Sequence, residues 1–213
     1  MQVTLLVAAA LAAVTNWFAR WRGNERLETW VKPLTTMLVI GLAIANDAEI
    51  KYSGIAVVAL VLCLEGDIAL LPAIDKFIVG LASFLLGHLA FIVLFVRYGM
   101  SHRWLGVIAF GGALVLAATA GRLIVRGAGI KDPALRIPVI AYLLVICSMT
   151  VFGWATGRGW VIAGTTLFVI SDTLLGWGRF AMDDSKPESK WLTTAVMVTY
   201  HGAIAALALS LWA

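Results

Sequence analysis

Short polar patches divide the chain into apolar runs of about 16–22 residues, close to the length that an α-helix needs to cross the ~30 Å hydrocarbon core of a bilayer. The alternating pattern that a transmembrane β-barrel requires is absent. We therefore predict an all-α fold, a polytopic membrane helical bundle of about eight transmembrane helices. They are expected at residues 2–19, 32–46, 54–73, 77–96, 102–120, 137–154, 158–178 and 192–211.

The composition agrees with this fold class, since 62% of the 213 residues are hydrophobic, against about 45–50% in a soluble domain. No polar stretch is long enough for a soluble domain, so residues 1–213 are expected to form one transmembrane domain. The first run has its arginines after it, which favours a retained helix over a cleaved signal peptide. Cys63 and Cys147 are expected to be reduced packing residues.

The basic residues predict the orientation of the bundle. Of the 16 lysines and arginines, all but Lys51, Arg97, Arg103 and Arg158 fall on the side of the first, third, fifth and seventh loops. Because cytoplasmic loops carry an excess of Lys and Arg, both termini are expected to lie outside. The net charge of +4 follows from this bias, so it does not indicate a nucleic-acid partner.

Few polar side chains interrupt the apolar runs. An ionisable group inside the membrane costs about 2.5–3.5 kcal/mol, so such groups normally face the protein interior and serve a function. At about 1.5 Å of rise per residue, most of those found here lie in the cytoplasmic half of the membrane. The candidates are Lys32, Glu65, Asp67, His88, Asp172, Tyr200 and His201.

Glu65 and Asp67 cannot both face one cavity, because two positions on a helix differ by about 200° of rotation. Asp67 and Asp172 are each expected about 8–9 Å from the cytoplasmic end of a helix, so Asp67 is the better candidate. A structural interpretation stays open for each polar residue, as an interhelical hydrogen-bonding group or, for Lys32, as an anchor at the membrane surface.

Several stretches occur together in a fixed order. They are "KPLTTML" (32–38), "GDIALL" (66–71), "KFIVGLASFLLGHLAF" (76–91), "GTTLFVISDTLL" (164–175) and, more weakly, "TYHGAIAALAL" (199–209). In this combination the sequence resembles the lysoplasmalogenase (YhhN-like) family of integral membrane enzymes. Each stretch alone would be weak, whereas their order along most of the chain is specific.

The resemblance implies a pair of catalytic carboxylates, Asp67 and Asp172. It implies no metal ion or cofactor. The residues that it places around the substrate are Lys32, His88, Ser171 and Tyr200.

Two positions depart from the family pattern. Phe91 stands where members usually have Tyr, and Ile204 stands at about the place of a Gln. Both replacements remove a polar group from the expected pocket.

The family's reaction is hydrolysis of the vinyl-ether bond of lysoplasmalogens, lysoplasmenylethanolamine or lysoplasmenylcholine, to a fatty aldehyde and glycerophosphoethanolamine or glycerophosphocholine. One carboxylic acid would protonate the β-carbon of the enol ether, and one carboxylate would stabilise the oxocarbenium ion and activate water, as in glycosidases. We favour Asp172 as acid and Asp67 as base. The implied partners are a lysophospholipid substrate and membrane lipids. The expected location is the bacterial inner (cell) membrane, with the site towards the cytoplasmic leaflet. No oligomeric state is predicted.

Two other functions stay open. A metal-dependent membrane lipid hydrolase of the alkaline-ceramidase type would need about three protein ligands, commonly His, whereas only His88 and His201 lie in predicted helices. A proton-coupled transporter would relay protons through membrane carboxylates, but such proteins tend to have internal repeats, and no repeat is visible.

Overall fold

The computed structural model describes residues 2–45, 50–183, 185 and 189–212, and every regular element in this part of the chain is a helix. Within it, eight segments are long and apolar enough to cross a membrane, which confirms the predicted fold class. The elements are α1 (Gln2–Arg22), α2 (Glu25–Ile44), α3 (Ile50–Ala69), α4 (Phe77–Tyr98), α5 (Arg103–Leu116), the π turn η1 (Ala117–Gly121), α6 (Arg122–Lys131), the short η2 (Pro133–Leu135), α7 (Arg136–Ala155), α8 (Gly159–Phe180), α9 (Lys190–Leu209) and the short η3 (Ser210–Trp212).

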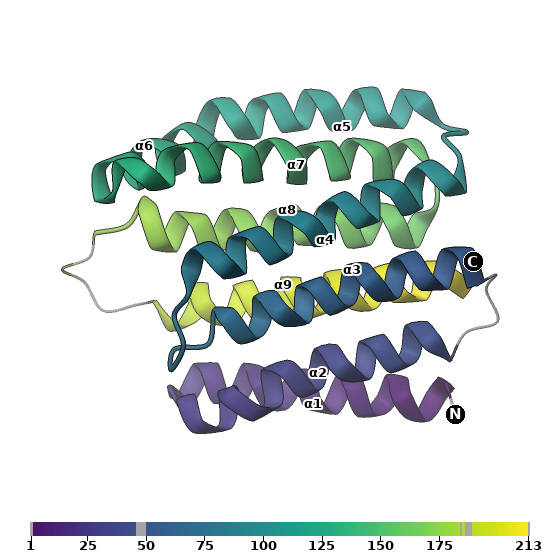
Figure 1. Cartoon of the computed structure of the whole chain (residues 1–213), viewed down its shortest axis with the longest axis horizontal. Coiled ribbons are helices and arrows are strands. Elements are labelled where there is room, and N and C mark those ends of the chain that lie inside the picture. Colours follow the sequence, from purple (N-terminus) through teal and green to yellow (C-terminus); the bar gives the residue numbers. More distant parts are fainter. Residues whose placement is uncertain (1, 46–49, 184, 186–188, 213) are drawn as a thin grey trace.

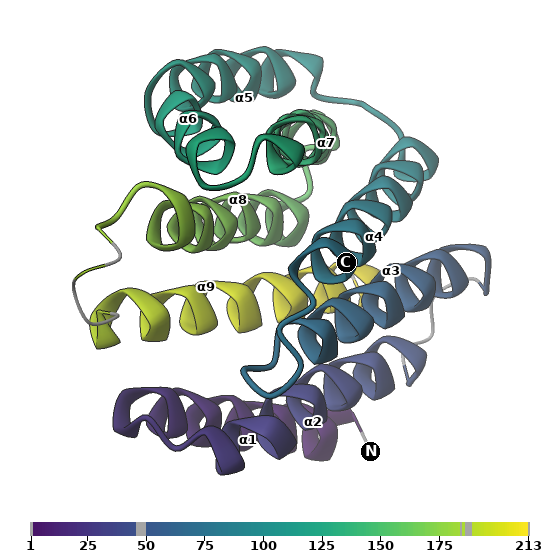
Figure 2. The same cartoon turned by 60° about the vertical axis from the view of Figure 1, so that its left-hand side comes forward.

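The helices run up and down, and both chain ends lie at the same end of the bundle (Figure 1). The α1–α2, α3–α4, α6–α7 and α8–α9 connections lie at the opposite end, which we term the basic end because Arg20, Arg22, Lys76, Lys131 and Arg179 flank it. Figure 2 shows α1 and α2 on one side of the molecule and α5, α6 and α7 on the other, with α3, α4, α8 and α9 between them. The chain is an integral, multi-pass membrane protein.

The second helix begins at Glu25, seven positions before the predicted start at residue 32. Asn24 caps it, because its side-chain oxygen accepts a hydrogen bond from the backbone N–H of Leu27 (3.1 Å). One turn into the helix, buried Glu28 forms an ion pair with Arg20 of α1 (3.0 Å). The polar stretch before residue 32 is therefore the first part of α2. Lys32 lies about 10 Å from the start of the helix, measured along its axis.

The fifth span continues far beyond its predicted end. A π turn at Ala117–Gly121 joins α5 to α6, so residues 121–136, which the predicted helix bounds leave as a connection between the fifth and sixth helices, are mostly helical. Ile124 and Ala128 lie one turn apart and are buried in a cluster with Phe180 of α8. This segment therefore has an apolar helical face although its overall composition is polar.

The distribution of polarity is inverted relative to a soluble protein. Trp30 and Trp191 are 79% and 75% exposed on the outer surface, where lipid or its headgroups would contact them. In contrast, Lys32, Asp67 and His88 are no more than 4% exposed. Ionisable side chains inside a membrane bundle mark a functional site by default.

Candidate active site

Asp67, in the last turn of α3, lies at the centre of a hydrogen-bonded group at the basic end. Its Oδ2 accepts hydrogen bonds from the hydroxyls of Thr36 (2.6 Å) and Tyr200 (2.7 Å). The Lys32 Nζ lies 3.5 Å from its Oδ1 and donates to its backbone carbonyl (3.3 Å). Lys32 and Thr36 are one turn apart on α2, so both reach the same carboxyl group. We term these four residues the Asp67 site.

Asp172, on α8, has fewer and different partners. The phenol of Tyr142 on α7 donates a hydrogen bond to its Oδ2. The Nε2 of His88 on α4 lies 3.9 Å from the same oxygen, too far for a direct hydrogen bond. The His88 ring is fully buried, and neither of its nitrogens has a hydrogen-bond partner among the residues that the structure describes. We term these three residues the Asp172 site.

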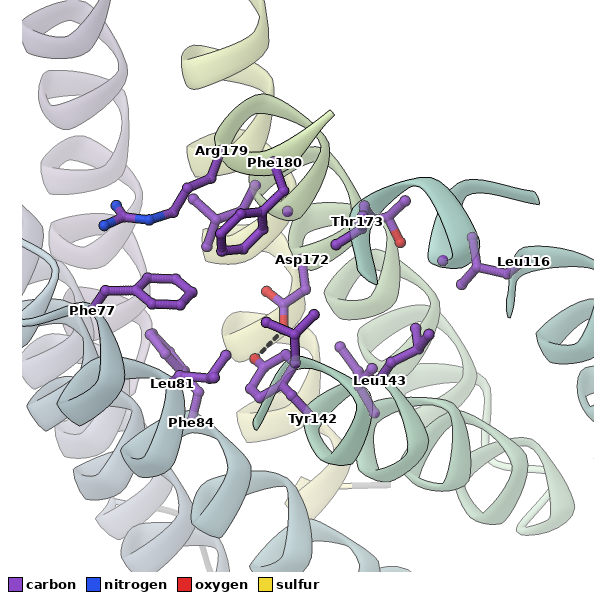
Figure 3. Close-up of a pocket in the computed structure, with 16 residues that line it drawn as sticks. Phe77, Leu81, Phe84, Leu116, Tyr142, Leu143, Asp172, Thr173, Arg179 and Phe180 are labelled. Atoms are coloured by element: carbon purple, nitrogen blue, oxygen red, sulfur yellow. Dashed lines mark hydrogen bonds between the residues drawn. The ribbon is translucent and has the colours of Figure 1, made fainter. Parts of the chain in front are cut away.

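A narrow cavity opens beside Asp172 (Figure 3). Its volume is about 60 Å³, and side chains of α4, α7 and α8 supply most of its walls. Apart from Asp172, Tyr142, Thr173 and Arg179, the walls are formed by aliphatic and aromatic side chains and glycines. The apolar residues labelled in the figure are Phe77, Leu81, Phe84, Leu116, Leu143 and Phe180. The lining of this cavity suits apolar groups, and it places one carboxyl group against them.

Two phenylalanines separate the Asp67 site from the Asp172 site. Phe84 of α4 lines the cavity, and its ring centroid lies 5.8 Å from that of Tyr200. Phe168 of α8 lies 4.5 Å from the His88 ring and 5.6 Å from the Tyr200 ring. The two carboxyl sites therefore share one aromatic layer but have no side-chain hydrogen bond in common among the described residues.

Other predicted residues lie apart from these contacts. Glu65 is exposed on the outer face of α3, as the helical-face argument predicts. The Ser171 hydroxyl donates to the backbone carbonyl of Val196 (3.0 Å), so it joins α8 to α9 and contacts neither carboxyl group. Phe91 and Ile204 are fully buried in the main apolar core.

Several contacts were missed from the sequence. Thr36 and Tyr142 bind the two carboxyl groups, but both are uncharged polar residues of a kind that is common in membrane helices, so nothing in the sequence distinguishes them as site residues. Glu28 lies before the predicted start of the second helix at residue 32, so it is not among the ionisable residues that the sequence places in helices. Arg179 follows the predicted seventh helix and contributes there only to the charge of a loop, whereas in the structure its side chain lines the cavity.

The two helical histidines do not converge. His88 lies beside Asp172, whereas His201 accepts a hydrogen bond at Nδ1 from the indole N–H of Trp17 on α1 (3.0 Å). Over the part of the chain that the structure describes, no three His, Cys, Asp or Glu side chains lie close enough to hold a metal ion. Cys63 and Cys147 are free thiols, as predicted.

Relatives of this protein cover almost the whole chain. The model of the YhhN family matches residues 27–211. Lysoplasmalogenase TMEM86B of Homo sapiens is 28% identical over 200 residues, which cover 91% of this chain and 80% of that protein. Lysoplasmalogenase TMEM86B of Sus scrofa is 30% identical over 202 residues, covering 91% and 80%, and that of Rattus norvegicus is 26% identical over 219 residues, covering 98% and 84%. No solved structure matches the chain significantly.

Proposed function

The chain belongs to the YhhN family, and from this premise we propose that it is an ether-bond hydrolase that cleaves the vinyl-ether bond of lysoplasmalogens. The substrates would be lysoplasmenylethanolamine and lysoplasmenylcholine, and the products a fatty aldehyde with glycerophosphoethanolamine or glycerophosphocholine. The relatives named lysoplasmalogenase support this class of reaction. The observation that carries the proposal is the Asp172 carboxyl group in the wall of an apolar cavity.

The chemistry needs one acid and one carboxylate. A proton is added to the β-carbon of the enol ether, and the adjacent carbon becomes an oxocarbenium ion. Water adds to that carbon, and the resulting hemiacetal collapses to the aldehyde and the free glycerol hydroxyl. Glycosidases divide the work between two carboxyl groups in the same way, because their transition state is also oxocarbenium-like.

Asp172 is the proposed acid. It faces the apolar cavity, its hydrogen bond comes from the uncharged phenol of Tyr142, and no lysine or arginine is paired with it among the described residues. Apolar surroundings favour the neutral form of a carboxyl group, which is the form that donates a proton. His88, at 3.9 Å, is placed to return a proton to Asp172 between turnovers.

Asp67 is the proposed carboxylate. A buried lysine and two hydroxyl donors are the partners that stabilise an ionised carboxyl group. Phe84 lies between Asp67 and the cavity, since it packs against Gly66 and lines the cavity wall. We propose that the alkenyl chain displaces the Phe84 ring, so that Asp67 can stabilise the oxocarbenium ion and activate the attacking water.

The basic end is the proposed cytoplasmic end, because cytoplasmic loops carry the excess of Lys and Arg. The site would then face the inner leaflet of a bacterial inner membrane. A cysteine introduced at exposed Asp132, in the α6–α7 connection, is expected to react with a membrane-impermeant maleimide only after the cells are opened. Labelling of intact cells would reverse this orientation.

The test of the function compares two lipids. Purified protein is incubated with a vinyl-ether lysophosphoethanolamine and with its saturated alkyl-ether analogue, whose β-carbon has no double bond and cannot be protonated. We expect aldehyde from the first lipid only and, in heavy water, one deuterium on the carbon next to the aldehyde carbonyl. Absence of aldehyde from the vinyl-ether lipid would overturn the proposed function.

A further inference from the structure

Lys32, which the family resemblance places around the substrate, is engaged by Asp67. Lys32 is 4% exposed, and its ammonium lies 3.5 Å from Asp67 Oδ1 and donates to the Asp67 carbonyl. A phosphate bound by Lys32 would take the cation away from the carboxylate that needs it. The phosphate of a lysophospholipid therefore requires another cation near the cavity.

The position of Arg179 suits it to be that cation. Of the described residues that line the cavity beside Asp172, it is the only basic one. It also lines a second cleft of about 170 Å³ at the basic end, together with Lys32 and Glu28, so it stands where the two spaces meet. Its guanidinium lies 4.2 Å above the centre of the Phe77 ring, and its side chain is 38% exposed (Figure 3).

The present partner of Arg179 is easily exchanged. Its guanidinium pairs with Asp75 of the α3–α4 connection at 3.3 Å, and the Asp75 side chain is 65% exposed. Exposed ion pairs of this kind contribute about 0–1 kcal/mol. A phosphate can accept two parallel hydrogen bonds from the guanidinium and would bind it more strongly.

The spacing along α8 fits the substrate. Arg179 follows Asp172 by seven positions, so both lie on nearly the same face of the helix, about 10 Å apart along its axis. In a lysoplasmalogen, seven bonds separate the β-carbon of the vinyl ether from the phosphorus, or about 8 Å at the reach per bond of an extended chain. A phosphate at Arg179 would bring the β-carbon to the level of Asp172.

We propose that Arg179 binds the phosphate of the lysophospholipid substrate and thereby sets the depth at which its vinyl ether meets Asp172. This inference rests on the proposed function. Asp75 holds the guanidinium at the cavity mouth until the phosphate replaces it, and Phe77 supports the flat face of the guanidinium.

The test measures binding separately from hydrolysis. The probes are the saturated alkyl-ether lysophosphoethanolamine and the matching alkylglycerol without phosphate, titrated against purified protein in detergent. We expect Arg179→Gln to weaken binding of the phosphate-bearing probe about tenfold and to leave alkylglycerol binding within about twofold. Arg179→Lys is expected to recover part of the loss, and Asp75→Asn to tighten binding of the phosphate probe a few-fold, because its competitor is removed.

The outcomes separate the two proposals. Equal affinity of native protein and Arg179→Gln for the phosphate probe would overturn the phosphate site, whatever the hydrolysis assay gives. An equal loss for both probes would show that Arg179 supports the cavity instead of binding phosphate, and would also overturn it. Selective loss of phosphate binding in a protein that releases no aldehyde would retain the phosphate site and reject the proposed reaction.

Discussion

The Asp67 site and the Asp172 site hold the same chemical group in different surroundings. Asp67 is 1% exposed and has a lysine and two hydroxyl donors as partners. Asp172 has one phenol donor and a histidine at 3.9 Å, and it borders a cavity. The Asp67 carboxyl group is buried and paired with a cation. The Asp172 carboxyl group borders a cavity, and its nearest partners are an uncharged phenol and a histidine.

This difference suggests a division of labour between two residues of identical type. A compensated carboxylate is suited to stabilising a cation, and a carboxyl group against an apolar wall is suited to donating a proton. Phe84 and Phe168 lie between the two sites, because Phe168 contacts His88 and Tyr200, and Phe84 contacts Tyr200 and lines the cavity beside Asp172. Changes at either site, or at Phe84, should therefore have distinguishable effects.

The largest effect is expected from removing the cation of the Asp67 site. Lys32→Met leaves Asp67 buried without its countercharge, which typically costs about 3–5 kcal/mol. Thermal unfolding in detergent should show this loss. The double variant Lys32→Met/Asp67→Asn should regain most of the stability and remain inactive. If Lys32→Met alone is as stable as the native protein, the ion pair does not contribute to stability.

A smaller effect is expected at the boundary between the sites. A Cβ at Gly66 would lie 2.5–2.9 Å from three atoms of the Phe84 ring, so Gly66→Ala must push the ring towards the cavity. Such overpacking costs about 1–3 kcal/mol, and KM for the lipid should rise.

Gly54→Ala, on the same helix, is the matched control. A Cβ there would meet no atom within 4 Å, so a change of at most about 1 kcal/mol is expected, in the stabilising direction. Equal behaviour of the two variants in unfolding and KM would contradict the role given to Phe84.

Removing one phenol from each site should separate the sites kinetically. Tyr142→Phe removes the side-chain hydrogen bond that Asp172 accepts among the described residues. We expect kcat to fall about tenfold, which corresponds to the loss of about 1.4 kcal/mol of stabilisation. Tyr200→Phe should have a smaller effect, because Lys32 and Thr36 still bind Asp67. Steady-state rates of aldehyde release in both variants measure this difference, and the reverse order would exchange the roles of the two sites.

The smallest effect is expected from a chelator. The described residues offer no cluster of three metal ligands, so EDTA should leave the rate of aldehyde release unchanged. A loss of activity that zinc restores would favour the metal-dependent lipid hydrolase instead.

The sequence predicted the framework of the site better than its contacts. The helical-face argument separated Asp67 from Glu65, and both membrane aspartates lie in the half of the bundle near the basic end. This succeeded because depth follows from position along a helix, and an ionisable residue in an apolar helix is rare enough to be noticed.

The sequence does not show how each helix is rotated about its own axis relative to its neighbours. Nothing in one sequence tells which face of α7 meets α8, so Tyr142 could not be assigned to Asp172, or Thr36 to Asp67. The same limit affected Lys32, because its distance from Asp67 depends on how α2 packs against α3. Polar composition also concealed the helical start of α2 and the whole of α6.

The central claim is that both aspartates are needed to cleave a vinyl ether, and Asp67→Asn and Asp172→Asn test it most directly. With each variant shown to be folded, the rate of aldehyde release from a vinyl-ether lysophosphoethanolamine should fall about 10²–10⁴-fold. A rate close to that of the native protein in either variant would contradict the account.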